Sequence, residues 1–217
     1  MAKAITWAAK DCSADIISMS FGFDEEILVK GELAISNAIS EALRTKNQRI
    51  LFFAAAANEG GNQPEMFPAR HLYVISIRGT DDKGWLQRFN PPADYAGFKC
   101  FMTLGQDVPG ASLSKDGGTD VCKSGTSVST PIAAGIAAML LGYARVYETE
   151  LKKILHARDT WRSSELWTIA GMRKMFGMLS TDMLDRWSYL SAIEFTSSSH
   201  ELRLGMIALA VSGKAKG

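Results

Sequence analysis

The stretch from Ser127 to Tyr143 constrains the fold of this 217-residue chain more than any other part of its sequence. As a helix it is apolar or small on every side, and Pro131 fits the first turn, where its missing N–H costs nothing. A helix without a polar face belongs in the centre of a protein, and its small residues let neighbouring backbones approach closely. The sequence therefore predicts a domain built around one buried helix.

Length and charge exclude several classes of protein. The longest apolar stretches, 132–141 and 50–57, fall well short of the ~20 residues that a membrane-spanning helix needs, so we expect no transmembrane segment and no membrane partner. Lys and Arg total 24 against 23 Asp and Glu, and this net charge of +1 gives no reason to expect nucleic-acid binding. With 47% hydrophobic and 22% charged residues, the composition is that of a globular protein.

The cysteines Cys12, Cys100 and Cys122 form neither a disulfide framework nor a zinc-binding pattern, because their number is odd and no two have CxxC spacing. We therefore expect reduced thiols, no metal and no cofactor. The sequence as given begins without a secretion signal, which favours an intracellular location.

The first part of the chain alternates helices with strands. A helix is expected over residues 3–10, and the short apolar run 15–20 is typical of a strand. Residues 32–46 have the 3.6-residue apolar period of an amphipathic helix. The run 50–55 is continuously apolar, as in a parallel strand that is covered on both faces. This order predicts an α/β fold with a parallel sheet.

The rest of the chain divides into two regions. Further strands are expected over 72–77 and 99–104, and a glycine-rich loop over 105–118. Beyond Arg145, tryptophans, methionines and scattered charges indicate three or four short amphipathic helices. We therefore expect a main domain over residues 1–147 and an α-helical C-terminal extension over 148–217. The extension is expected to pack on that domain, and partner binding is the alternative.

Ser127 is the first candidate for chemistry. It stands at the start of the predicted buried helix, two residues after Gly125, which permits a tight backbone turn. A hydroxyl at a helix N-terminus is held rigidly, and the helix favours negative charge that develops there. These are the requirements of a nucleophile. The alternative is that Ser127 merely caps the helix, as serines often do.

Asn58 is the second candidate, because it directly follows the predicted strand 50–57. Ligands of open parallel sheets bind at the carboxyl ends of the strands. An asparagine at that edge can direct its amide N–H at the oxyanion that forms when a serine attacks a peptide carbonyl. The alternative is a turn-forming asparagine ahead of Gly60 and Gly61.

Several segments, in the order in which they occur along the chain, resemble consecutive blocks of the subtilisin family of serine endopeptidases. They are the helix around Trp7, Asp15–Gly22, Ala54–Gly60, Phe67–Ala69 and Gly125–Pro131. The resemblance covers about residues 4 to 145. It implies a three-layer domain with a parallel sheet, in which Ser127 is the nucleophile and Asn58 the side-chain oxyanion donor. The backbone N–H of Ser127 would be the second donor.

The resemblance also implies a peptide-binding cleft with two walls. One wall matches Ser20, Phe21 and Gly22, and the other matches Ala55, Ala56 and Ala57. A peptide or protein substrate would bind there as an added strand, with side-chain pockets giving a modest preference. Two departures bear on the depth of the pocket: Ala57 stands where many members have glycine, and Phe23 where a small residue is usual.

Two family blocks that supply the catalytic Asp and His do not occur in this sequence. The histidines His71, His156 and His200 lack the family's flanking residues, and Asp15 precedes a strand where the family's Asp ends one. A serine without a general base is a weak nucleophile. We therefore expect the carboxyl-terminal part of a peptidase domain, inactive alone, whose N-terminal half is missing because the sequence is a fragment or starts at an internal Met.

Two other functions remain open. A non-catalytic relative would keep the cleft as a peptide-binding module, and the sequence upstream of Met1 distinguishes it from a peptidase. An unrelated α/β hydrolase requires a Gly-x-Ser-x-Gly elbow, which the context of Ser127 does not provide.

Overall fold

The computed structural model describes residues 1–26, 28–93, 99–111, 121–155, 160–184 and 186–212, and its centre is a six-stranded sheet of order β1-β4-β5-β6-β10-β9. The parallel strands are β1 (Ile16–Met19), β4 (Leu51–Ala55), β5 (Ile75–Thr80), β6 (Cys100–Leu104) and β10 (Trp187–Leu190). Only β9 (Ser180–Leu184) is antiparallel to its neighbour. The predicted α/β class with a parallel sheet is confirmed.

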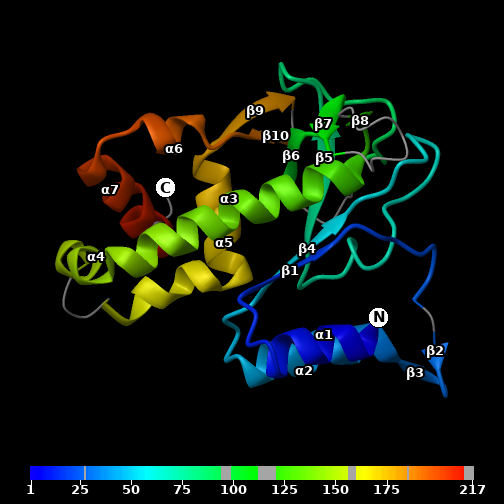
Figure 1. Ribbon diagram of the computed structural model, residues 1–217, viewed down its shortest axis with the longest axis horizontal. Coiled ribbons are helices and arrows are strands. Elements are labelled where there is room, and N and C mark those ends of the chain that lie inside the picture. The colour runs from blue at the N-terminus through cyan, green and yellow to red at the C-terminus, as the bar shows by residue number, and fades with distance from the viewer. Residues whose placement is uncertain (27, 94–98, 112–120, 156–159, 185, 213–217) are drawn as a thin grey trace.

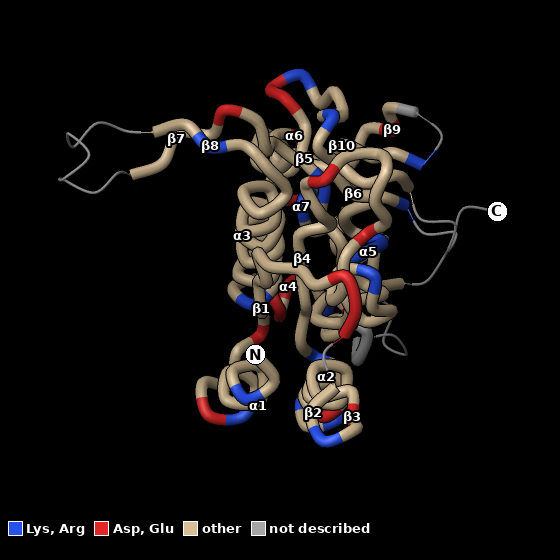
Figure 2. The backbone as a smooth tube through the Cα atoms, turned by 90° about the vertical axis from the view of Figure 1, so that its right-hand side faces the viewer, with Lys and Arg blue, Asp and Glu red and all other residues tan. Residues whose placement is uncertain are grey.

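The helices and two short hairpins surround this sheet (Figure 1). In the first part of the chain, α1 (Ala2–Lys10) and α2 (Ala34–Thr45) pack on one another, and α3 (Thr126–Val146) crosses the sheet. The C-terminal part contains α4 (Glu148–Ile154), the 3-10 helix η2 (Thr160–Trp167), α5 (Ile169–Met178), α6 (Ile193–Ser197) and α7 (His200–Val211). The hairpins are β2 (Leu28–Val29) with β3 (Glu32–Leu33), and β7 (Val108–Gly110) with β8 (Val121–Lys123), which projects from the body in Figure 2.

Strand β4 is the most protected part of the sheet, since all five of its residues are buried. It lies between β1 and β5 and is connected to β1 through α2, so the predicted strand-helix-strand unit is confirmed. Helix α2 begins two residues later than predicted because Glu32 and Leu33 form β3. The Glu26 carboxylate accepts the first free N–H groups of the helix, from Ile35 and Ser36.

Strand β5 is shifted along the sequence from its predicted position. The strand begins at Ile75, because Val74 N–H closes a turn onto the His71 carbonyl. It continues through Gly79, where a Cβ atom would lie 2.7 Å from the Phe89 ring and 3.1 Å from Ser129 Oγ. Since side chains alternate along a strand, the face with Gly79 meets α3, and Arg78 points to the opposite face.

Helix α3 differs in two respects from its prediction. It begins at Thr126, so Pro131 is its sixth residue and lies inside the helix. Its inner side is buried against β1, β4, β5 and β6, but Pro131, Gly135, Ala138 and Gly142 form an exposed stripe, so the helix is not buried on every side. Among the described helices it is the one whose length and composition would suffice to cross a bilayer, although its packing on the sheet is that of a core helix.

The C-terminal segment contains more than the predicted helices. Strands β9 and β10 extend the main sheet beyond β6, so a prediction of helices alone was wrong there. The short run Trp-Ser-Tyr-Leu of β10 has the aromatic residues that are common in strands, but four residues are too few for their alternation to be recognised in the sequence. The domain boundary expected at residue 147 stays a prediction.

Phe176 of α5 connects the C-terminal segment to the sheet. Its fully buried ring lies 5.8 Å from that of Phe53 in β4 and 5.5 Å from that of Phe101 in β6, between ring centroids. We expect Phe176→Ala to lower the free energy of unfolding by about 3–5 kcal/mol, because it leaves a cavity among aromatic rings. Urea unfolding measures this, with the exposed Ile193→Ala as control at under about 0.5 kcal/mol. Equal midpoints for both variants would contradict the packing.

Candidate active site

Asn58 lies where the sequence places it, three residues after the end of β4, with an exposed side chain. Its Oδ1 accepts the backbone N–H of Thr126 at 2.8 Å and lies 3.2 Å from the Thr126 hydroxyl. The same hydroxyl lies 3.2 Å from the carbonyl oxygen of Ala57. Since a backbone N–H must donate, the atom that faces Thr126 is the amide oxygen, and the NH₂ group remains for another acceptor. The chain bends at Asn58 and Glu59, ahead of Gly60, so the position of Asn58 also fits the turn-forming alternative, but its side chain contacts Thr126.

Gly125 permits this contact. Its φ of +137° is closed to other residues, and a Cβ atom there would lie 3.1 Å from Asn58 Oδ1. Its own N–H donates to the Gly105 carbonyl at 2.7 Å, which ties the start of α3 to the end of β6. The glycine that the sequence suggested for a tight turn is therefore required both by its backbone angle and by the close approach of Asn58.

Ser127 is the second residue of α3 and is half-exposed. The N-cap is Gly125 and makes no side-chain cap bond, so Ser127 does not cap the helix. Within the described part of the chain, no hydrogen bond to its hydroxyl or its N–H is recorded, as expected for donors in a first helical turn. Both groups can therefore meet a ligand beside Asn58.

Pro131 and Ser20 together determine the hydrogen bonding of the Ser127 carbonyl group. A helical residue at position 131 would donate its N–H to the Ser127 carbonyl, and proline has no such group. The Ser127 carbonyl instead accepts the Ser20 hydroxyl at 2.9 Å. The segment of Ser20, Phe21 and Gly22 is thereby held next to the candidate nucleophile.

Met66 contacts both predicted walls of the cleft. A Cβ atom on Gly22 would lie 2.8 Å from both Cβ and Sδ of Met66, and the Met66 N–H donates to the Ala56 carbonyl at 2.8 Å. Its neighbour Phe67 exchanges two backbone hydrogen bonds with Phe23. Ala55, Ala56 and Ala57 are buried, so this wall is formed largely by backbone.

Sequence reasoning missed Met66 and Thr126. Thr126 lies inside the segment Gly125–Pro131 that resembles the family, and its position directly before Ser127 is a signal that could have pointed to a role at the site. Met66 carried no signal, because its contacts depend on the path of the loop that follows Gly61.

The described histidines lie elsewhere. His71 accepts the Tyr73 N–H at 3.2 Å and lies against aromatic rings, where burial lowers its pKa. His200 bonds Tyr143 at 2.6 Å and Glu150 at 2.8 Å, and Tyr143 is about 24 Å along α3 from Ser127 at 1.5 Å per residue. His156 is outside the described residues.

Asp15 takes part in a different interaction. Its carboxylate lies 2.7 Å from Arg145 and 3.7 Å from Lys46. Asp15 precedes β1, whereas Ser20, which bonds the Ser127 carbonyl, follows the other end of this strand. The structure thus brings together Ser127, Asn58, Ser20 and the walls of the cleft, and it places the described histidines and Asp15 outside this site.

Solved structures show the class of fold to which this arrangement belongs. The chain is similar to the Prenylagaramide maturation protease PagA with a TM-score of 0.65, at 21% identity over 98% of this chain and 67% of that one. It is similar to the self-cleaved protease domain of PatA with a TM-score of 0.53, at 32% identity over 64% of this chain and 49% of that one. The fold is therefore that of a subtilisin-like protease domain.

Sequence comparisons define the family. The model of the Subtilase family matches residues 1–166, and the chain belongs to this family. It is 30% identical over 155 residues to the Subtilisin-like protease het-Q2 of Podospora anserina, and 31% identical over 171 residues to the Thermostable alkaline protease of Halalkalibacterium halodurans. These matches include 70% and 76% of this chain, which spans 40% and 41% of the length of the two relatives.

Gly125→Ala tests the geometry of the site. We expect a loss of about 1–3 kcal/mol in the free energy of unfolding, because alanine is strained at this φ and its Cβ displaces Asn58. Gly135→Ala is the matched control: it lies inside α3 with open space around its Cβ, so alanine should stabilise by up to about 1 kcal/mol. Thermal unfolding of both variants checks the signs, and a stabilised Gly125→Ala would refute the conformation at Gly125.

Proposed function

We propose that this chain carries the nucleophile and the oxyanion-binding groups of a subtilisin-like serine endopeptidase. The observation that carries the proposal is the bond from the Thr126 N–H to Asn58 Oδ1, because it orients the amide NH₂ of Asn58 beside Ser127. Two donors, this NH₂ and the Ser127 N–H, are then available to one oxygen atom. An oxyanion hole requires such preorganised donors.

In this mechanism Ser127 Oγ attacks the carbonyl carbon of the scissile peptide bond and gives its proton to a general base. The carbonyl oxygen takes the negative charge and accepts the two donors. The C–N bond then breaks, the base returns the proton to the leaving amine, and water hydrolyses the acyl-enzyme by the same steps. The N-terminus of α3 adds a favourable field for the developing anion.

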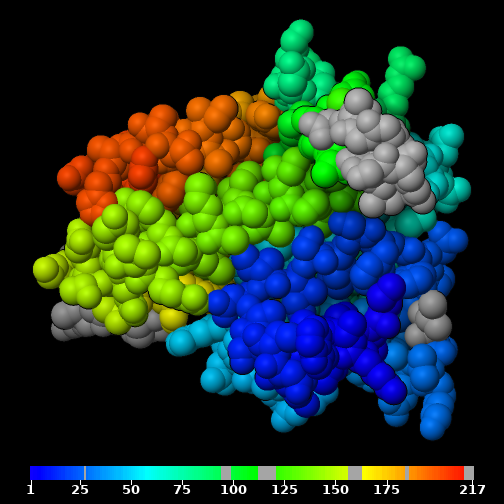
Figure 3. All heavy atoms as spheres, in the orientation of Figure 1, coloured from blue at the N-terminus to red at the C-terminus, as the bar shows by residue number. Residues whose placement is uncertain are grey.

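The general base and its acid are proposed to come from a part of the peptidase outside these 217 residues. Two surfaces support this. Strand β1 pairs with β4 alone among the described strands, yet its residues Ile16 and Ile17 are apolar and only partly buried. The stripe of Pro131, Gly135, Ala138 and Gly142 on α3 is exposed as well. Helix α3 lies beside the N-terminal segment of the chain on one face of the molecule (Figure 3). An added strand and layer would cover both. On this proposal the 217-residue chain alone is inactive.

A peptide or protein substrate is proposed to bind as an extended strand along Ser20, Phe21 and Gly22, with Ala55 to Ala57 opposite. Backbone hydrogen bonds supply the affinity in such complexes, and pockets select side chains. The Met66 side chain lies against Gly22 of one wall, and its backbone is bonded to Ala56 of the other, so we propose that this side chain limits the main pocket to small side chains.

The second candidate function is a peptide-binding module without catalysis. For the isolated chain this second function is favoured because His71 and His200, the histidines that the structure describes, both lie away from Ser127. A module binds peptides equally well with and without the Ser127 hydroxyl, and it has no hydrolytic activity in any longer form. The full transcript upstream of Met1 therefore decides between the two functions, because a peptidase requires an Asp block and a His-Gly block in frame.

Ser127→Ala in the longer protein should abolish peptide hydrolysis. In subtilisin, a relative, loss of the nucleophile lowers turnover about 10⁶-fold. Asn58→Ala should lower turnover about 10²–10³-fold with little change in substrate binding, as loss of one oxyanion donor does in subtilisin. Steady-state kinetics measure both, with Ser124→Ala as the matched serine control. An unchanged rate in Ser127→Ala would refute the catalytic proposal.

Met66→Ala should change substrate preference. Removing the longer side chain enlarges the pocket, so the ratio of kcat/KM for a large apolar residue over alanine should rise about 10-fold or more. The control is Leu72→Ala, an exposed residue of the same loop. If the ratio is unchanged while Ser127→Ala is inactive, Met66 is not the limiting residue although the peptidase assignment stands.

A further inference from the structure

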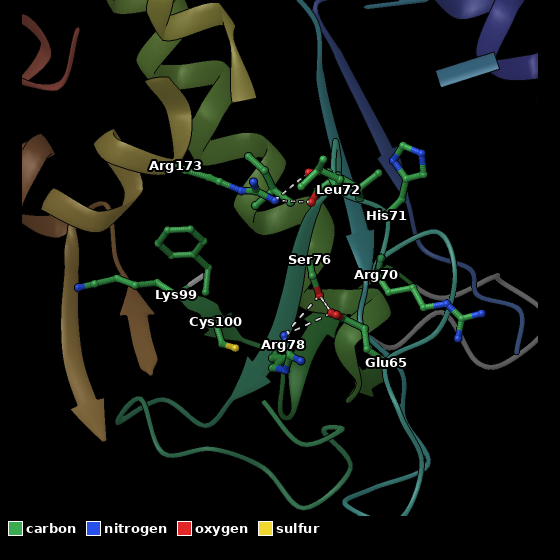
Figure 4. A pocket seen from close by; sticks show the side chains of 13 residues that line it. Glu65, Arg70, His71, Leu72, Ser76, Arg78, Lys99, Cys100 and Arg173 are labelled. Atoms are coloured by element: carbon green, nitrogen blue, oxygen red, sulfur yellow. Dashed lines mark hydrogen bonds and ion pairs between the residues drawn. The ribbon is translucent and has the colours of Figure 1, made fainter. Parts of the chain in front are cut away.

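The loop that carries Met66 is tied to the sheet by the residue directly before it, Glu65. Glu65 lines a second cavity, of about 150 Å³, which lies on the face of the sheet opposite to α3. Figure 4 shows Glu65, Ser76 and Arg78 at this cavity, with their polar atoms directed at one another. Because the cavity leaves space beside Glu65, close packing does not by itself fix the loop at this point.

Arg78 is the fixed end of this contact. It belongs to the central strand β5, and only 1% of its surface is exposed. Its Nη2 donates to the Pro92 carbonyl at 3.0 Å, and its guanidinium lies 5.3 Å from the centre of the Trp187 ring in β10. A guanidinium near the face of an aromatic ring is attracted to it. The guanidinium is therefore held by elements outside the loop of Met66.

The Glu65 carboxylate meets two groups of β5. Its Oε1 lies 3.3 Å from Arg78 Nη1, and the Ser76 hydroxyl donates to the same oxygen. Only 8% of the Glu65 surface is exposed, so the carboxylate is largely removed from bulk water. Breaking a buried ion pair on one side leaves a charge without a partner, which is strongly destabilising. Glu65 is thus confined to a position from which it reaches Arg78.

Met66 and Phe67 carry this constraint to the peptide cleft. The Met66 side chain lies against Gly22, where an added Cβ atom would be 2.8 Å from the Met66 sulfur. The next residue, Phe67, exchanges two backbone hydrogen bonds with Phe23. Since consecutive Cα atoms stay about 3.8 Å apart, a displacement of the residue before Met66 moves Met66 as well. The ion pair therefore bears on the position of the Met66 side chain in the cleft.

We propose that Glu65 and Arg78 are a positioning pair, which sets the depth of the main specificity pocket by holding Met66 against Gly22. Neither residue touches the substrate, and both act through Met66. The inference deepens the proposed peptidase function and rests on it for the assignment of the pocket. A small side chain of the substrate fits the pocket with or without the ion pair, whereas a large apolar side chain enters only when Met66 moves aside.

A double variant of the longer protein tests the effect on substrate preference. Glu65→Leu with Arg78→Met removes both charges, so no unpaired charge is left in the interior. We expect the ratio of kcat/KM for a large apolar residue over alanine to rise about 10-fold, with kcat for the alanine substrate within about 3-fold of the parent. Adding Met66→Ala should raise the ratio no further, because the pair acts through Met66. Lys99→Met, which removes an exposed cation of the same cavity, is the matched control and should leave the ratio unchanged.

Hydrogen exchange in the 217-residue chain tests the contact without reference to hydrolysis. The Met66 amide donates to the Ala56 carbonyl, and in the double variant we expect it to exchange at least about 10-fold faster. The Thr126 amide, which donates to Asn58, should exchange at an unchanged rate. A loss of stability throughout the chain would instead accelerate both amides. NMR resolves the two rates.

Ser76→Ala is a milder second variant, because it removes one donor to Glu65 and leaves both charges in place. It should raise the Met66 exchange rate about 2–10-fold, the effect of one hydrogen bond, and it decides the matter if the double variant does not fold.

Three results would overturn the proposal. They are an unchanged preference of the double variant in a protein that hydrolyses peptides, an unchanged exchange rate at Met66, and equal acceleration at Met66 and Thr126. If the longer protein hydrolyses no peptide, the peptidase proposal fails, and the exchange rates alone decide whether the ion pair holds Met66. The two failures are therefore distinguishable.

Discussion

The hydrogen bond between Asn58 and the backbone of Thr126 is the constraint on which the candidate site depends. It joins two residues 68 positions apart, one just beyond the buried strand β4 and the other at the first turn of α3. Because α3 packs on four strands of the sheet, fixing its first turn also fixes the hydroxyl and N–H of Ser127. Gly125 is required for this contact, and Pro131 leaves the Ser127 carbonyl for Ser20. The site is therefore set by backbone geometry at the edge of the sheet.

Much of the α/β core could be predicted, because long patterns determine it. The continuous apolar run of β4 and the amphipathic period of α2 each admit few alternatives, and both elements formed within two residues of their predicted bounds. Strand β10 could not be predicted, since its four residues pair with β6, a strand distant in sequence. Pro131 was placed in the first turn of its helix because propensity alone does not reveal that the helix begins at Thr126, directly after the N-cap Gly125.

The site was predictable only in part. Ser127 and Asn58 were singled out by their positions after a glycine and after a strand, but only the resemblance to a family joined them. Met66 and Arg78 could not be found from sequence. Met66 lies in the loop that turns between the end of β4 and the start of β5, and Arg78 contacts Glu65 of that loop as well as Pro92 and the Trp187 ring. That loop contacts the predicted peptide cleft through Met66 and lines the second cavity through Glu65 and Arg70.

The central claim is that Ser127 is the nucleophile, and covalent labelling measures it directly. The longer protein is treated with a fluorophosphonate, which phosphonylates an activated serine with loss of fluoride, and the modified peptide is identified by mass spectrometry. We expect one phosphonylated residue, Ser127, with labelling slowed about 10²–10³-fold when Asn58 is replaced by alanine, which cannot donate to the anionic adduct. Labelling at another serine, or none in a protein that carries both the Asp and the His-Gly blocks, would contradict the assignment of Ser127.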